Sequence, residues 1–405
     1  MPIRPPQHSN FATSEGESPL STIGTPGTAP LQIAVALDGA GWHPAAWRLP
    51  QARPADLFGA RYWTDLVTEA ERGGVDLVTF EDALRLQSHD RFTPDRRTDE
   101  VRGRLDAVLV ATRVAPVTDR IGLLPTVVTS LTEPFHAAKA IATLDHISHG
   151  RAGVRVQVGG RSDELGHLGR DRPTSIEELF AEAGDYVEVL RRLWDSWEDD
   201  AEIRDVATGR FIDRNKLHHI DFSGATFSVK GPSITPRPPQ GQPLVGALGP
   251  VPVASRLIAQ AADLAFVTPR DAVAAAAIVD ELEAEQPVRA PTVFADLLVL
   301  LEDTPQTARA ALDELDSANG APLTSDALIV TDTPAAVADL IEDWRDAGID
   351  GVRLRPARLP RDLDRITSEL LPLLRRRGLH RGVEEPVTLR ERLGLIRPAN
   401  RYALI

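Results

Sequence analysis

Short apolar segments alternate with segments of helical periodicity along most of the chain, and this alternation limits the folds available to it. Continuous apolar strands between helices are typical of a parallel sheet whose faces are covered by helices. The strands are expected at Leu31–Leu37, Val75–Phe80, Arg120–Val128, Ala152–Val158, Leu244–Leu248, Leu264–Val267, Thr292–Leu301 and Gly351–Leu354. Eight such strands predict an α/β fold, a closed (β/α)8 TIM barrel, with an open Rossmann-type sheet as the alternative.

The helices of this barrel are expected at Arg61–Arg72, Arg102–Ala115, Pro134–Ile147, Ile176–Trp194, Val253–Ala262, Ala272–Glu285, Pro305–Ser317, Ala335–Ala347 and Leu363–Arg377. Together with the strands they assign residues 31–378 to the barrel. Residues 198–241 are polar and lack a helical period, which predicts a long insertion over the C-terminal face of the barrel, where active sites lie.

Both ends of the chain differ from this barrel pattern. Residues 1–30 are rich in Pro, Ser, Thr and Gly and contain few apolar side chains, so a flexible N-terminal tail is expected. Residues 379–405 are expected to form a C-terminal tail that packs on the barrel or on a partner subunit.

Composition excludes several classes of site. The 405 residues include no cysteine, which rules out disulfides, thiolate metal sites, iron–sulfur clusters and a cysteine nucleophile. The formal net charge of −14 argues against nucleic acid or an anionic membrane as a partner. No apolar stretch approaches the ~18–20 residues that cross a bilayer, and the N-terminus does not resemble a secretory signal. A cytoplasmic protein is therefore expected.

Common catalytic motifs are also missing. The sequence has no Walker phosphate loop, no G-x-G-x-x-G after a strand and no G-x-S-x-G nucleophile elbow. His146 and His149 lack a third ligand at suitable spacing, so no metal site is expected and a hydrogen-bonding role at a helix end is favoured. The arginine-rich tract from Arg353 to Arg401 is interspersed with acidic residues, which favours a solvated face or an oligomer contact.

A barrel of this kind carries its site at the C-terminal ends of its strands. The residues expected there are Asp38, Asp82, Val128, Gly159, Gly249 and Thr268. From the residues alone, the functional prediction ends at an enzyme with a barrel fold.

Several motifs resemble one known family. The run PFHAAKAIATLDHISHGR from Pro134 to Arg151 resembles the signature of bacterial-luciferase-like flavin-dependent monooxygenases. The elements AWRLP at 46–50, LWDSWEDDA at 193–201 and FSVKGPSITPRPPQGQP at 227–243, and the segment 388–403, are similar to its nitrilotriacetate, pristinamycin and dibenzothiophene-sulfone monooxygenase branch. The resemblance covers residues 31–403 in the same order.

The resemblance implies a luciferase-like barrel that inserts one oxygen atom from O2 into a small organic substrate. It also implies reduced FMN, supplied by a separate NAD(P)H:flavin reductase through diffusion, and a homo-oligomer, a dimer or a tetramer. Two other functions stay open. One is a flavin-free, non-catalytic paralogue that acts as a binding or regulatory subunit, and the other is a relative that uses another flavin or a deazaflavin.

Residue by residue, the resemblance places Asp82, Val128 and Thr129 beside the flavin ring. Around the phosphate it places Ile176, Phe180, Gly249, Pro250 and Val251. Trp42, His43 and Trp47 are candidates for the substrate pocket, with core packing favoured for either tryptophan, and no catalytic residue is assigned.

The phosphate positions depart from the family pattern. Proline has no N–H group, and the side chains of Ile176, Phe180 and Val251 have no donor, so weak phosphate binding is expected. Alternatively, Pro250 simply starts the helix and nearby backbone groups hold the phosphate, or a guanidinium group does so, from Arg155, Arg161 or Arg170.

Overall fold

The computed structural model describes residues 30–88, 96–169, 175–249, 252–382 and 385–403. Its strands are β1 (Gln32–Leu37), β2 (Leu77–Phe80), β3 (Gly122–Val128), β4 (Gly153–Gln157), β5 (Glu202–Asp205), β6 (Arg210–Ile212), β7 (Phe222–Ser223), β8 (Ser228–Val229), β9 (Leu244–Leu248), β10 (Leu264–Val267), β11 (Thr292–Leu301), β12 (Leu328–Asp332) and β13 (Gly351–Pro356). The expected N-terminal tail, residues 1–30, lies outside the described part of the chain except for Pro30.

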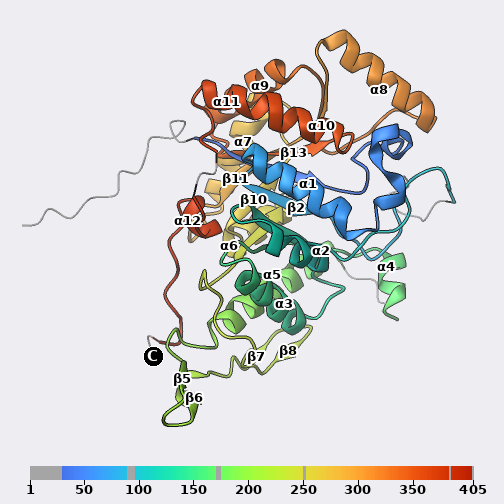
Figure 1. The fold of residues 1–405 in the computed structure, drawn as a ribbon. Coiled ribbons are helices and arrows are strands. Elements are labelled where there is room, and N and C mark those ends of the chain that lie inside the picture. The colour runs from blue at the N-terminus through green and yellow to red at the C-terminus, as the bar shows by residue number, and fades with distance from the viewer. Residues whose placement is uncertain (1–29, 89–95, 170–174, 250–251, 383–384, 404–405) are drawn as a thin grey trace, which may run out of the picture.

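The helices are α1 (Ala60–Gly73), α2 (Ala107–Val114), α3 (Pro134–Ile147), α4 (Ser162–His167), α5 (Ile176–Asp195), α6 (Pro252–Ala261), α7 (Ala272–Ala284), α8 (Pro305–Asn319), α9 (Pro334–Asp346), α10 (Arg361–Arg365), α11 (Leu371–Arg376) and α12 (Leu389–Arg392). A π-helical turn, Ile366–Leu370, joins α10 to α11. Figure 1 shows these helices around a central sheet.

Eight parallel strands close into a barrel in the order β1, β2, β3, β4, β9, β10, β11, β13. Closure is made where β13 pairs with β1, with Gln32 opposite Gly351. The eight strands are those that the apolar pattern predicts, so the TIM barrel is confirmed and the open sheet is excluded. An additional strand, β12, pairs with the second half of β11.

Every second residue of a barrel strand points into the interior, and the inward-facing side chains of neighbouring strands form layers. Two such layers fill this barrel. The layer near the strand starts is apolar and consists of Ala34, Leu77, Leu124, Leu244, Leu264, Phe266, Phe294 and Leu389. Leu389 comes from α12, so the C-terminal segment plugs this end of the barrel. The layer near the strand ends is polar and includes Thr79, Thr126, Arg155, Asp296 and Arg353, all of them buried.

The insertion lies at the opposite end of the barrel from the one expected. It connects the end of α5 to the start of β9, and both points are at the N-terminal ends of the strands. The Gln240 side chain donates to the carbonyl oxygen of Ala152, one residue before β4, and its Oε1 accepts from the N–H of Arg390 in α12. The prediction that the insertion covers the C-terminal face of the barrel is therefore wrong. Helix α5 runs antiparallel to the strands, so it returns the chain to the N-terminal face before the insertion begins.

The β5–β6 hairpin of the insertion projects beside the C-terminal end of the chain (Figure 1). Asn400 donates to the carbonyl oxygens of Asp195 and Trp197, and Arg397 pairs with Asp199. No helix in the described ranges combines the length and the apolarity needed to cross a bilayer.

Candidate active site

Charged side chains occupy the end of the barrel at which strands β2, β4, β11 and β13 terminate. Asp296 of β11 accepts two hydrogen bonds from Arg353 of β13, Nε to Oδ1 at 2.7 Å and Nη2 to Oδ2 at 2.5 Å. Arg355, two residues farther along β13 and so on the same face, pairs with the same carboxylate and with Asp326. Burial alone would raise the pKa of Asp296, but the two guanidinium groups outweigh it and lower the pKa.

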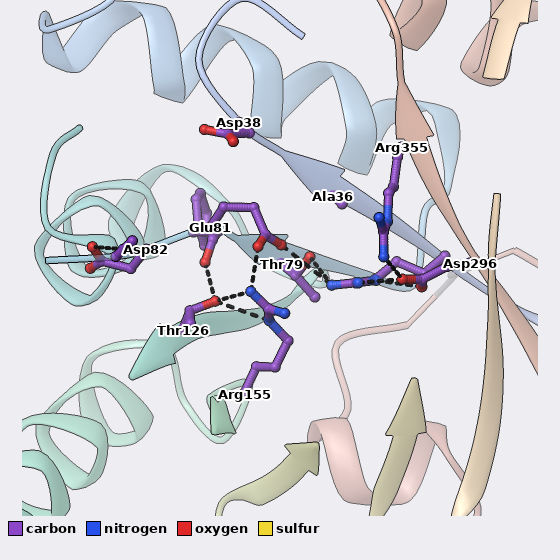
Figure 2. A network of polar contacts seen from close by, with 12 residues as sticks. Ala36, Asp38, Thr79, Glu81, Asp82, Thr126, Arg155, Asp296 and Arg355 are labelled. Carbon is purple, nitrogen blue, oxygen red and sulfur yellow. Dashed lines mark hydrogen bonds and ion pairs between the residues drawn. The ribbon is translucent and has the colours of Figure 1, made fainter. Parts of the chain in front are cut away.

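Glu81 extends this network to the other half of the barrel. It follows β2 directly, and its Oε2 accepts from Arg155 Nη2 of β4 at 2.5 Å. Its Oε1 lies 3.4 Å from Arg353 Nη1. Burial would raise the pKa of Glu81, but Arg155 and Arg353 hold it below the usual range. Figure 2 shows Glu81, Arg155 and Thr126 pointing toward one another.

Thr126 of β3 holds the Arg155 guanidinium through hydrogen bonds. Its Oγ1 accepts from Arg155 Nε at 3.0 Å and Nη2 at 2.6 Å, and donates to the carbonyl oxygen of Phe80 at 2.7 Å. Burial lowers the pKa of Arg155 to about 10, so the guanidinium is charged at neutral pH. The three arginines pair with three carboxylates, Glu81, Asp296 and Asp326, so the result is a rigid floor whose charges are balanced.

Two further carboxylates lie beside this floor and are committed to other partners. Asp38, after β1, pairs with Arg104 through Nε at 3.2 Å and Nη2 at 2.7 Å. Asp82 accepts from the N–H groups of Ala83 at 2.7 Å and Ala107 at 2.9 Å, which holds the start of α2. Burial raises the pKa of Asp82. Both residues stand apart from the linked arginines in Figure 2.

Comparison with known proteins assigns this barrel to a family. Residues 40–325 match the family described as luciferase-like monooxygenase. The chain belongs to this family. It is a flavin-dependent monooxygenase, as the resemblance of the Pro134–Arg151 run predicts.

Relatives of known activity match nearly the whole chain. N-acetyl-S-(2-succino)cysteine monooxygenase from Bacillus subtilis is 28% identical over 92% of this chain and 98% of the relative. Nitrilotriacetate monooxygenase component A from Aminobacter aminovorans is 27% identical over 90% of this chain and 96% of the relative. A structure of riboflavin lyase with modified FMN and riboflavin superimposes with a TM-score of 0.80 at 25% identity, over 92% of this chain and 98% of that one.

The ring-site residues predicted for this luciferase-like monooxygenase all lie at the mouth of the barrel. Val128 ends β3 and packs with Leu131 and Leu165 in a small buried apolar cluster. Thr129 is buried and its N–H donates to the carbonyl oxygen of Gln157 at 2.9 Å. Asp82 is at the same end of the neighbouring strand.

The predicted phosphate residues are distributed over a wider area. Ile176 begins α5 and its side chain is 49% exposed. Phe180, one turn later, lines a groove of about 540 Å³ between α5 and α6, together with Val253 and Leu257. Gly249 follows β9, and its N–H donates to the carbonyl oxygen of Phe266 at 2.9 Å. Pro250 and Val251 lie outside the described residues.

The three predicted substrate-pocket residues have different surroundings. Trp42 packs against the Arg355 guanidinium, which lies 4.7 Å from its ring centre. Trp42 and His43 both line a pocket of about 170 Å³ after β1. His43 is buried, and its Nε2 lies 3.0 Å from Asp316 Oδ1. Trp47 donates from Nε1 to the carbonyl oxygen of Asp99 at 3.0 Å and packs on the core.

The barrel floor is what sequence reasoning missed. Arg353, Arg355, Arg358 and Arg390 are buried, so the prediction of a solvated face or oligomer contact is wrong for this part of the arginine-rich tract. The available signal is a charged residue at every second position of an apolar strand, as in GVRLRP at 351–356, because such residues point into the barrel. Arg155, considered as a phosphate ligand, is held by Glu81 and Thr126.

The donor set of the floor fits the flavin that this family uses. Arg355 Nε is buried and has no acceptor in the described part of the chain. It stands beside Trp42, and an isoalloxazine ring carries both acceptor atoms and a flat face for aromatic packing. The residues present therefore provide an unused donor and an aromatic neighbour.

Proposed function

We propose that this monooxygenase uses reduced FMN, delivered by a separate NAD(P)H:flavin reductase, and O2 to insert one oxygen atom into a small organic substrate. The observation that carries the proposal is the full-length similarity to a relative named as component A of its monooxygenase, on a barrel whose floor is built of paired arginines and carboxylates. When bound, reduced FMN activates O2; the protein contributes binding, orientation and protection from water.

The residues of this chain have separate tasks in that function. Asp82, Val128 and Thr129 would lie beside the flavin ring, and Ile176, Phe180, Gly249, Pro250 and Val251 near its phosphate. Glu81 and Asp296 fix the guanidinium groups of Arg155 and Arg353 in place, so the floor is a preorganised polar surface beneath the ring. Trp42 and His43 would border the substrate, while Trp47 supports the loop that carries them. A homo-oligomer, a dimer or a tetramer, is part of the same proposal.

Anaerobic titration with reduced FMN, followed by O2 uptake with a flavin reductase and candidate substrates, tests this function. We expect saturable binding of reduced FMN and reductase-dependent O2 consumption. Parallel titration with the deazaflavin F420 and with riboflavin provides the comparison. The proposal would be contradicted if the protein bound F420 tightly but not reduced FMN, or if it bound no flavin.

The phosphate site has its own test. The double variant Pro250→Ser, Phe180→Tyr returns an N–H group and two hydroxyl groups to the expected phosphate surroundings. We expect reduced FMN to bind this variant more tightly than the wild type, measured as the Kd under anaerobic conditions. Equal tight binding would show that other donors already hold the phosphate.

A further inference from the structure

Two arginines meet at the mouth of the barrel, outside the floor network. Arg85 belongs to the loop after β2, and Arg161 directly precedes α4, in the segment after β4. Glu164 of α4 faces Arg85, with its Oε1 3.9 Å from Arg85 Nε, and the charges of both arginines oppose the rise in its pKa that burial causes. Leu165, the next residue of α4, packs on Val128 at the end of β3. The two arginines therefore flank the strand end at which the flavin ring is expected.

Each arginine retains a buried donor that nothing in the described ranges accepts. The side chains of Arg85 and Arg161 are only 26% and 18% exposed. Asp163 takes two donors of Arg161, Nε at 3.1 Å and Nη2 at 3.3 Å. The Nη1 atoms of both arginines are buried without a hydrogen-bond partner. A buried N–H group of a charged side chain is costly unless an acceptor reaches it.

The surroundings favour a negatively charged acceptor. Burial and the charge of Arg161 both lower the pKa of Arg85, so the two guanidinium groups are close enough to repel each other. Glu164 and Asp163 offset this repulsion in part, but the contact of Glu164 with Arg85 is too long for a hydrogen bond, and Nη1 of Arg85 stays without an acceptor among the described residues. Two guanidinium groups with free N–H donors match the several oxygens of one oxyanion.

We propose that Arg85 and Arg161 together bind an oxyanion, a phosphate, sulfonate or carboxylate group, at the mouth of the barrel. The carrier of that group is either the flavin, through its phosphate, or the organic substrate; this choice of carriers rests on the proposed function. In both cases the pair selects for anionic ligands and orients them against the end of β3.

Binding of inorganic anions tests the pair directly. Calorimetric titrations with phosphate, sulfate and acetate would compare the wild type with Arg85→Met and Arg161→Met. Arg61→Met, at an arginine that is 88% exposed on α1, is the matched control. We expect saturable binding of at least one anion to the wild type and to the control, and a loss of roughly ten-fold or more in each of the two variants. Equal affinities in all four proteins, or no saturable binding of any anion to the wild type, would overturn the proposal.

Flavin titrations distinguish the two carriers. If the flavin phosphate is the ligand, Arg85→Met and Arg161→Met weaken FMN binding and leave riboflavin binding unchanged. If the substrate carries the oxyanion, both flavins bind all four proteins equally and inorganic anions compete with the substrate alone. A wild type that binds phosphate but no flavin would contradict the proposed function and still support the arginine pair.

Arg85→Lys and Arg161→Lys separate charge and geometry from folding. Lysine keeps the positive charge but lacks the planar fork of donors. We expect the lysine variants to recover part of the anion affinity, with melting temperatures equal to those of the methionine variants. Anion affinity that follows the melting temperature across all the variants would contradict direct binding.

Discussion

Asp145 is part of the motif that carries the family resemblance, yet it lies far from the barrel mouth. It sits near the end of α3 and is 0% exposed. Its Oδ1 accepts from the N–H of Ala152 at 3.1 Å and from Gln240 Nε2 at 2.5 Å, and its Oδ2 accepts from the N–H of Gln240 at 3.2 Å. The carboxyl group thus ties the insertion to the start of β4, which is a structural role.

Burial raises the pKa of Asp145 from 3.8 to about 6. The folded state therefore keeps this proton to a higher pH than the unfolded state does. Its contribution to stability is fully present below the unfolded pKa and is lost as the pH rises through about 6. Relative to Asp145→Asn, the wild type should lose about 2–2.5 kcal/mol of unfolding free energy between about pH 4 and about pH 7.

Urea denaturation of both proteins across this range measures the difference. Because all other titrating groups are shared, their pH dependence cancels in the comparison. A difference in unfolding free energy that stays constant with pH would show that Asp145 does not bind its proton more tightly in the folded protein.

Positions at the barrel mouth were predictable where a strand end marks them, as at Asp82, Val128 and Thr129, whose contact with a flavin stays a prediction. The partners of Arg353 were not predictable, because they are distant in the sequence: Asp296 is 57 positions away and Glu81 is 272 positions away. No local pattern encodes which inward-facing charges meet across a closed barrel. The same limit applies to Arg85 and Arg161, which belong to separate loops, after β2 and after β4.

At the scale of elements, the four-residue helix α12 closes one end of the barrel interior. Its Leu389 is fully buried in the apolar layer of the barrel interior. The packing is close, because a Cβ atom on Gly122 would lie 2.5 Å from Leu389 Cδ1 and 3.0 Å from Cδ2. Leu389→Ala leaves a cavity there and should lower the unfolding free energy by about 2–5 kcal/mol.

Ile396→Ala is the control for this measurement, since Ile396 belongs to the same segment and is 71% exposed. The control should change the unfolding free energy by less than about 0.5 kcal/mol in urea titrations. Similar losses in both variants would mean that the segment does not act as a plug.

A second prediction at this scale concerns Gly184 in the middle of α5. A methyl group at this position would meet no atom within 4 Å, and alanine favours the helix over glycine. Gly184→Ala should therefore raise the unfolding free energy by about 0.5–1 kcal/mol, measured as a higher urea midpoint with an unchanged slope. A lower midpoint would contradict the open surroundings of this glycine.

Elements with strong periodicity were predictable almost to the residue, as α3 at 134–147 and α5 at 176–195 show. The start of α2 was predicted five residues too early, because Asp106 caps the helix by accepting from the N–H of Leu109. The helix expected at 363–377 is interrupted by a π-helical turn before Pro372, which has no N–H group to donate. β12 was missed because all five of its residues are only half-buried, so it lacks a continuous apolar signal.

At the scale of the whole molecule, the barrel depends on close contact where its last strand meets its first. A Cβ atom on Gly351 would lie 2.6 Å from the carbonyl oxygen of Gln32 and 2.7 Å from Phe294 Cε1. Gly351→Ala must push β13 away from both neighbours, so we expect a loss of about 1–3 kcal/mol in unfolding free energy. Gly184→Ala, which adds the same methyl group without a contact, is the matched comparison in the same urea titrations. Equal midpoints for the two variants would contradict the tight closure.

The pairing of Gln32 with Gly351 also sets an order of events during protein synthesis. Roughly 320 residues separate the two partners, so β1 leaves the ribosome long before β13 exists. Until then the growing sheet has an open edge at β1, and Leu389 has not yet reached the apolar layer that it closes. Nearly the whole chain must therefore be translated before the barrel can close, and until then the unpaired edge of β1 is open to pairing with other chains.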